Sequence, residues 1–400
     1  MKNTRRFIAI VVMVWGRVSF GQGTAPTIPA EIFRAPTGPF AVGTLDTLWI
    51  DVARQELMTR VPNDKRHVPV RIWYPAQATG KAVAPYILRA EEFGPKSPFT
   101  PVLHVKTHAV VGAPVATKEK KYPVLLYNHG GGWSRFTATY EIEQLTSLGY
   151  VVVSVDHLGF DQSHSLSNGY EFNGDTLGFP TPTNKDLRAD ALGSWDYLEK
   201  VLFPMWVGDA QFVLGKIDGL NRDATSPLKG RLDLDRIGAF GWSFGGATTV
   251  DLLIRDPRVK VAIDQDGQLF GMGRVKGADR PVMLMHNTSD PMRGVPEAQR
   301  DVLTEMVKMV SGWDESFRSA STKDVYDVKI ARTGHGNFSD LTLFFPRDPS
   351  TMEPQRAHDI ITAYTVAFFE RYFKGKESSL LQAASPDFPE VTFARKPSTR

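Results

Sequence analysis

Short apolar runs alternate with longer amphipathic segments along the chain from residue 122 onward. The apolar runs are almost unbroken by polar residues, which is typical of strands buried on both faces of a sheet. The segments between them carry apolar residues three or four positions apart, the spacing of an amphipathic helix. Strands and helices in alternation predict a mostly parallel sheet with helices on both faces, an α/β fold.

The predicted strands are Val124–Tyr127, Tyr150–Val155, Ile237–Phe240, Val259–Ile263, Val282–Met285 and Tyr326–Ile330. The predicted helices are Thr137–Leu148, Asp186–Phe203, a helix ending at Arg255, Pro296–Val310 and Ala357–Phe373. Active sites in such sheets lie at the carboxyl ends of the strands, so the loops that follow the strands are where chemistry is expected.

Two strands are predicted ahead of this alternation, Leu48–Asp51 and Val68–Tyr74, and they suit an antiparallel pair. Residues 76–121 are irregular and residues 204–234 are loosely patterned, so both are predicted to be insertions. With no internal repeat in the chain, the simplest organisation is a single domain over residues 46–400.

The first 21 residues have the pattern of a signal peptide. Lys2, Arg5 and Arg6 precede the apolar stretch Phe7–Gly16, which is too short to span a bilayer comfortably, and small residues follow it. We predict cleavage after Gly21 and therefore a secreted or periplasmic protein. Residues 22–45 are rich in Pro, Gly and Thr and are predicted to form an N-terminal arm.

Removal of this segment changes the charge balance of the chain. Four of its residues are basic and none is acidic, so the formal net charge falls from +3 to −1. The basic character therefore belongs to the export signal and gives no indication of nucleic-acid binding. The absence of cysteine excludes disulfides, a thiol nucleophile and a thiolate zinc site.

The strongest chemical motif is Gly241-Trp-Ser-Phe-Gly245, between a predicted strand and a small-residue helix start. This is the pattern of a nucleophile elbow, in which Ser243 projects from a tight strand-to-helix turn. Glycines two residues before and after the serine relieve crowding around its backbone. The helix start also offers free backbone N–H groups to a developing oxyanion, so one donor is predicted to be the N–H of Phe244.

A serine hydroxyl needs a base, usually a histidine held by a carboxylate. His335 fits best among the nine histidines, because it lies in a glycine-flanked loop just after the last core strand. His358 is predicted to face solvent at the start of the last helix, and His286 to be a hydrogen-bonded core residue. For the acid, Asp266, Asp290 and Asp264 each follow or end a strand, and the periodicity alone does not choose between Asp266 and Asp290.

The second oxyanion donor is expected in the loop after strand Val124–Tyr127, which is His129-Gly-Gly-Gly-Trp133. Glycine-rich loops at this place turn backbone N–H groups toward an oxyanion. The same loop fails as a phosphate-binding loop, since no Lys-Ser/Thr pair follows it. His129 is predicted to brace the loop.

The chain resembles the platelet-activating factor acetylhydrolase (isoform II type) family of the α/β-hydrolase superfamily, from about residue 38 to the C-terminus. The segments that carry the resemblance are Gly38–Gly43, Trp73–Pro75, Tyr122–Leu126, His129-Gly130, Gly241–Ala247, Asp264–Gly267 and His335–Phe338. The elbow is general to the superfamily, whereas the His-Gly-Asn-Phe segment and the aspartate after the elbow are more specific.

The resemblance implies Ser243 as nucleophile, His335 as base, Asp266 as acid and Gly131 as second oxyanion donor. Asp290 stays the alternative acid. The implied reaction is hydrolysis of short-acyl esters or of short sn-2 acyl phospholipids through an acyl-enzyme, with transient contact with a lipid surface. No metal or organic cofactor is required. Aromatic residues that could wall the substrate pocket are Trp133, Phe160, Trp242 and Phe270.

Two alternatives stay open. The Gly-Trp-Ser-x-Gly-Gly elbow is also similar to that of prolyl-oligopeptidase-type serine peptidases, whose acid position would suit Asp290. Those enzymes usually carry a large propeller, and no repeats precede the first core strand here. The other alternative is a non-catalytic binding protein that retains the hydrolase fold.

Overall fold

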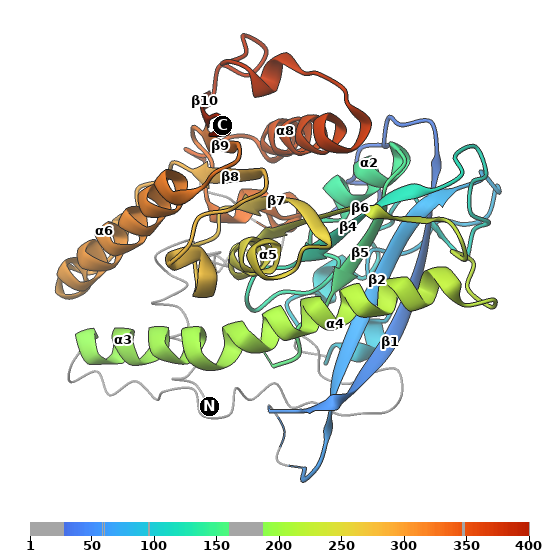
Figure 1. Ribbon diagram of the computed structural model, residues 1–400, viewed down its shortest axis with the longest axis horizontal. Helices are drawn as coiled ribbons and strands as arrows, with labels where there is room; N and C mark the ends of the chain where they lie inside the picture. Colours follow the sequence, from blue (N-terminus) through green and yellow to red (C-terminus); the bar gives the residue numbers. More distant parts are fainter. Residues whose placement is uncertain are drawn as a thin grey trace.

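The computed structural model describes residues 28–57, 59, 61–94, 97–159, 187–345 and 349–399. Within these residues, ten strands form one sheet in the order β10-β9-β8-β7-β6-β4-β5-β2-β1-β3 (Figure 1). Their bounds are β1 Ala41–Gln55, β2 Lys65–Ala76, β3 Ala109–Val111, β4 Tyr122–Asn128, β5 Val151–Val155, β6 Leu232–Trp242, β7 Val259–Gln265, β8 Val282–Asn287, β9 Val325–Ile330 and β10 Val391–Lys396. The predicted signal peptide lies outside the described residues.

The six central strands, from β5 to β9 in the sheet, run parallel to one another. Strand β2 is antiparallel to β5, β1 to β2, and β10 to β9. The mostly parallel sheet predicted from the apolar runs is therefore confirmed. The N-terminal arm ends earlier than predicted, because β1 begins at Ala41 and pairs with β2 along most of its length.

Helices cover both faces of this sheet (Figure 1). The longer ones are α2 Thr139–Ser147, α3 Leu187–Tyr197, α4 Phe203–Arg222, α5 Phe244–Arg255, α6 Glu297–Ala320 and α8 Pro354–Lys374, and α7 is the short Leu341–Phe344. Alternate residues of β4 point to opposite faces. Leu125 and Tyr127 join the core beneath α2 and α8, whereas Val124 and Leu126 join the core beneath α4 and α5.

The expectation of a loose insertion over residues 204–234 is wrong. These residues form most of α4 and the start of β6, and α4 continues from α3 through the π-helix Leu198–Leu202. Pro204 near the start of α4 has no N–H to donate to the preceding turn, and the wider π turn lies just before it. Apolar residues then recur at helical spacing and are buried, including Trp206, Val213 and Ile217.

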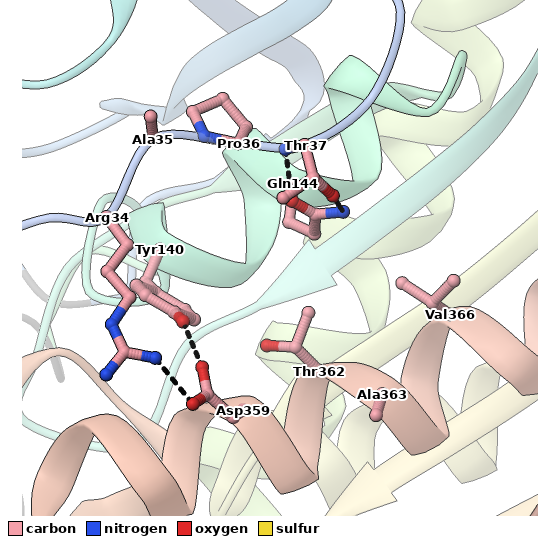
Figure 2. A pocket seen from close by; sticks show the side chains of 10 residues that line it. All are labelled: Arg34, Ala35, Pro36, Thr37, Tyr140, Gln144, Asp359, Thr362, Ala363 and Val366. Carbon is pink, nitrogen blue, oxygen red and sulfur yellow. Dashed lines mark hydrogen bonds and ion pairs between the residues drawn. The ribbon is translucent and has the colours of Figure 1, made fainter.

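The described part of the N-terminal arm packs against α2 and α8. Phe33 is buried, and Arg34 forms an ion pair with Asp359 of α8 at 2.6 Å. The amide side chain of Gln144 in α2 binds Thr37 twice, as acceptor from its backbone N–H and as donor to its hydroxyl. Figure 2 shows Arg34, Thr37, Gln144 and Asp359 around a cleft of about 330 Å³ between the arm and the two helices. None of the predicted site residues lines this cleft.

Candidate active site

The turn between β6 and α5 holds Ser243 in a backbone conformation that few residues adopt. Its φ is +59° and its ψ is −123°. A Cβ atom on Gly241 would lie 2.5 Å from the carbonyl oxygen of Gly245, and one on Gly245 would lie 2.1 Å from that of Asn128. Both glycines of the motif are therefore required by space, because such distances are closer than real Cβ contacts allow.

His335 lies beside this turn at the start of the 3₁₀-helix η5, His335–Phe338, which follows β9. Its Nε2 atom is 2.9 Å from Ser243 Oγ. Its carbonyl oxygen accepts a hydrogen bond from Trp242 Nε1 at 3.0 Å, and Asn337 Oδ1 accepts one from the N–H of Gly334 at 2.8 Å. These two hydrogen bonds hold the backbone at Gly334 and His335, and so fix the position of His335.

Asp266 lies on the other side of the histidine ring. Its Oδ2 atom is 2.6 Å from His335 Nδ1, so that nitrogen donates and the unprotonated Nε2 faces the hydroxyl of Ser243. Asp266 also has a positive φ, +60°, in the turn after β7. Its backbone N–H donates to the carbonyl of Met285 in β8 at 2.8 Å, which holds the strained turn in place.

Asn287, at the end of β8, is a part of the site that the sequence reasoning missed. Its backbone N–H donates to Asp266 Oδ1 and its side-chain amide donates to Oδ2, both at 2.7 Å. Burial alone would raise the pKa of Asp266, but the hydrogen bond and charge of His335 and the two Asn287 donors outweigh burial and lower it. The sequence could have indicated Asn287 through its position: it ends the strand that follows β7, so its side chain reaches the same edge of the sheet as Asp266.

The structure does not bring the other candidate acids to His335. Asp290 is exposed, and its carboxylate accepts from the N–H of Met292 at 2.8 Å. Asp264 is buried and accepts from the N–H of Gly267 at 2.7 Å. Of the three candidate aspartates, Asp266 is the one that contacts His335.

His358 and His286 have other partners than Ser243 among the described residues. His358 is buried, and the expectation that it faces solvent is wrong: its Nε2 donates to the carbonyl of Ser339 at 3.0 Å. His358 lies on a buried face of α8, and its ring packs 4.9 Å from the ring of Tyr140 in α2. His286 is only partly buried, and its Nε2 lies 3.8 Å from Asp327, beyond hydrogen-bond distance. The predicted core hydrogen bond of His286 is therefore absent from the described contacts.

The glycine-rich loop after β4 forms a tight turn beside the elbow. The N–H of Trp133 donates to the carbonyl of Gly130 at 3.1 Å, and Gly132 has φ +78°, as at the third position of a type II turn. Gly131 therefore stands at the second position. Among the described residues, its N–H has no hydrogen-bond acceptor. Its place in the turn and the start of α5 at Phe244 are consistent with a pair of oxyanion donors.

His129 is fully buried behind this loop. Its Nδ1 lies 2.7 Å from the carbonyl of Gly130, and its Nε2 accepts the backbone N–H of His157 at 3.3 Å. Burial lowers the pKa of His129 to about 4, so the ring is neutral at pH 7. This arrangement agrees with a brace for the loop.

Arg135, which follows the glycine-rich loop, links that loop to the end of β5. Its backbone N–H and its guanidinium both bind Asp156, just after β5. The guanidinium also binds Glu92 at 2.7 Å, so the end of the loop is held from two sides.

The four aromatic residues predicted as pocket walls have different surroundings. Trp242 is buried, and its ring lies 5.1 Å from the ring of His335. Trp133 is only partly buried and lies 6.3 Å from the ring of Trp242. Phe270 is packed against Trp195 at 4.6 Å within the core. Phe160 lies outside the described residues.

The described residues offer neither a metal-binding cluster nor a membrane-spanning helix. No group of three or more His, Asp or Glu side chains could hold a metal ion there. In the same residues, none of the helices combines the length and the apolar character needed to cross a bilayer.

Known proteins share sequence similarity with this chain. The family model described as platelet-activating factor acetylhydrolase, isoform II, matches residues 27–175 and 217–379. A probable 1-alkyl-2-acetylglycerophosphocholine esterase of Arthroderma benhamiae is 23% identical over 293 residues, which cover 68% of this chain and 66% of that relative. A platelet-activating factor acetylhydrolase of Cavia porcellus is 24% identical over 375 residues, which cover 88% of this chain and 79% of that relative.

A solved structure shares the fold. A ferulic acid esterase from Streptomyces cinnamoneus superposes with a TM-score of 0.64 and 26% identity, covering 91% of this chain and 98% of the other. Together with the mostly parallel sheet, this similarity shows an α/β-hydrolase fold. The relatives named as acetylhydrolase or esterase support carboxylic-ester hydrolysis as the class of reaction. Because the family model matches more than half of the chain, the chain belongs to the platelet-activating factor acetylhydrolase isoform II family.

Proposed function

We propose that this protein is a serine carboxylic-ester hydrolase that works through an acyl-enzyme at Ser243. The observation that carries the proposal is the chain of contacts from Ser243 Oγ to His335 Nε2 at 2.9 Å and from His335 Nδ1 to Asp266 Oδ2 at 2.6 Å. This is the geometry in which a base removes the serine proton while a carboxylate stabilises the imidazolium that forms.

The first half of the proposed reaction forms the acyl-enzyme. Ser243 Oγ attacks the ester carbonyl carbon as its proton passes to His335 Nε2. The carbonyl oxygen becomes an oxyanion that accepts hydrogen bonds from the N–H groups of Phe244 and Gly131. When the C–O bond to the alcohol breaks, the departing oxygen takes the proton from Nε2, which leaves an acyl group on Ser243 and a neutral His335.

In the second half, water replaces the alcohol. His335 Nε2 removes a proton from the water as its oxygen attacks the acyl carbon. The new oxyanion collapses, the bond to Oγ breaks, and Ser243 recovers its proton from His335. The products are one carboxylic acid and one alcohol, and the enzyme returns to its starting state.

For the substrate, we propose short-acyl esters, including phospholipids with a short sn-2 acyl group. Support comes from the family match and from the relative named as a 1-alkyl-2-acetylglycerophosphocholine esterase. The partly buried Trp133 beside Trp242 offers an apolar wall near the base. We further propose export through cleavage after Gly21 and transient contact with a lipid surface during turnover, both of which rest on the sequence pattern and on the family.

The experiment compares the wild type with Ser243→Ala, using p-nitrophenyl acetate and a fluorophosphonate probe followed by mass spectrometry. We expect labelling at Ser243 and a loss of about 10⁵–10⁶-fold in kcat for Ser243→Ala, since the nucleophile is gone. Ser316→Ala, on the exposed face of α6, is the control and should keep wild-type activity. Labelling elsewhere would contradict the mechanism, and a folded wild type without labelling would favour the non-catalytic alternative. A series of acyl lengths then tests the preference for short acyl groups.

A further inference from the structure

Asp264 carries a buried carboxyl group that takes no part in the proposed proton transfers. The residue is 2% exposed and lies in β7, in register with Gly241 of β6. Its Oδ1 atom accepts a hydrogen bond from the backbone N–H of Gly267 at 2.7 Å. One oxygen of the carboxyl group is thus bound to the turn that carries Asp266.

The same oxygen lies against the first turn of α5, the helix that begins at the nucleophile. A Cβ atom on Gly246 would lie 2.0 Å from Asp264 Oδ1, and a Cβ atom on Gly267 would lie 2.3 Å from it. Both distances are closer than any real Cβ contact, so each position requires a glycine as long as the carboxyl group is there. The carboxyl group therefore occupies the space between the elbow and the acid turn.

The elbow and the acid turn are in direct contact at this junction. The backbone N–H of Ser243 donates to the carbonyl of Gln265 at 2.9 Å. A Cβ atom on Gly267 would lie 2.5 Å from the carbonyl oxygen of Ser243. The contacts that set the distance between Ser243 and Asp266 therefore lie next to the carboxyl group of Asp264.

We propose that Asp264 is a positioning residue, which holds the acid turn against the elbow as a neutral carboxylic acid. The inference rests on the proposed function, because it assigns a role within the same site. A neutral group suits this place, since a second negative charge would repel both Asp266 and the oxyanion that forms beside the elbow.

The charges around Asp264 agree with the neutral form. Burial has the largest effect and raises the pKa of Asp264 well above its usual value. The N–H of Gly267 opposes that rise, whereas the carboxylates of Asp314 in α6 and of Asp266 add to it. No basic side chain among the described residues is hydrogen-bonded to Asp264.

The test replaces Asp264 with residues that keep or remove the contact. Asp264→Asn keeps the size and one oxygen acceptor without charge, so we expect kcat within about threefold of the wild type. Asp264→Ala removes the contact, and we expect kcat to fall about 10–100-fold with KM little changed, because the acid turn is misplaced. Rates are taken per site labelled by fluorophosphonate, with thermal unfolding measured alongside, and Asp264→Ser replaces the alanine variant if the latter does not fold.

Each outcome decides one part of the proposal. Wild-type kcat in Asp264→Ala would overturn the positioning role. A loss in Asp264→Asn as large as that in Asp264→Ala would overturn the neutral form. The neutral form would also be overturned if the acid-side limit of activity in Asp264→Asn shifted to lower pH. Such a shift would mean that a negative charge had been removed, which makes His335 harder to protonate. An active Ser243→Ala would contradict the proposed function itself, whereas an inactive Ser243→Ala beside a fully active Asp264→Ala contradicts this inference alone.

Discussion

At the scale of single residues, the candidate acid Asp266 is distinguished by its hydrogen-bond partners more than by its place in the sequence. Asp266 and Asp290 both follow core strands, which is why the strand pattern left both open. In the structure Asp266 contacts His335 and receives two hydrogen bonds from Asn287, whereas Asp290 is exposed. The elbow motif predicted the serine, and the glycine-flanked loop after the last core strand predicted the histidine, but a contact across two strands has no local sequence signal.

The two aspartates are distinguished by paired substitutions. We expect Asp266→Asn to lose about 10³–10⁴-fold in kcat, because the amide no longer holds the imidazole in the reactive tautomer. Asp290→Asn is the matched control and should stay within about twofold. Steady-state kinetics on p-nitrophenyl acetate give both values. A large loss confined to Asp290→Asn would reverse the assignment and favour the peptidase alternative.

The pH dependence of stability follows from the same contacts. Because the folded-state pKa of Asp266 is lowered, its stabilising contribution is complete above the pKa of an unfolded aspartate. That contribution is lost as the pH falls through the lowered folded-state value. We therefore expect Asp266→Asn to flatten the loss of stability on the acid side, as measured by denaturant unfolding between pH 3 and 7. If the free energy of unfolding of Asp266→Asn fell with decreasing pH as steeply as that of the wild type, the lowered pKa of Asp266 would be contradicted.

At the scale of elements, buried strands and amphipathic helices were predictable because their periodicity reflects burial. The boundaries were less so. Helix α6 runs to Ala320, ten residues beyond the predicted end at Val310, because Phe317 continues its buried face. Helix α4 was missed, since Pro204 and several glycines in the segment suggested a break. Strand β10 was missed as well, because its pairing with β9 joins segments that are distant in the sequence.

The loop after β4 allows a test that leaves its turn intact. Proline suits the second position of a type II turn, so Gly131→Pro removes the N–H donor without changing the turn type. We expect kcat to fall about 10²–10³-fold, the usual effect of losing one oxyanion donor. Gly131→Ala keeps the N–H and is the control, with activity expected near that of the wild type. If the two variants behave alike in steady-state assays, Gly131 is not a donor.

At the scale of the whole molecule, the N-terminal arm is a packed part of the domain. Phe33 lies 5.5 Å from the ring of Tyr86 and 5.9 Å from that of Phe344, so the arm joins the core formed with α7 and α8. Composition suggested a connecting arm, because proline and glycine give no periodicity. The contact partners lie far along the chain, where local patterns carry no information about them.

This packing predicts a difference between two neighbouring substitutions. Phe33→Ala should lower the free energy of unfolding by about 3 kcal/mol, as buried phenylalanines do when truncated. Arg34→Ala should change it by less than about 1 kcal/mol, because the ion pair with Asp359 is exposed to solvent. Urea unfolding of both variants measures the difference, and kcat per labelled site should be unchanged in each. Equal effects on stability would show that the arm does not depend on Phe33.

The pairing of Asp266 with Asn287 has a consequence for how such a site can change. The amide nitrogen of Asn287 lies 2.7 Å from the oxygen that binds His335, so two neighbouring strand ends reach nearly the same point above the sheet. A carboxylate on either strand could face the imidazole while the other strand supplies an amide. The negative charge would then move from one strand to the next by exchange of the side chains at positions 266 and 287, and the order of the strands in the chain would stay the same.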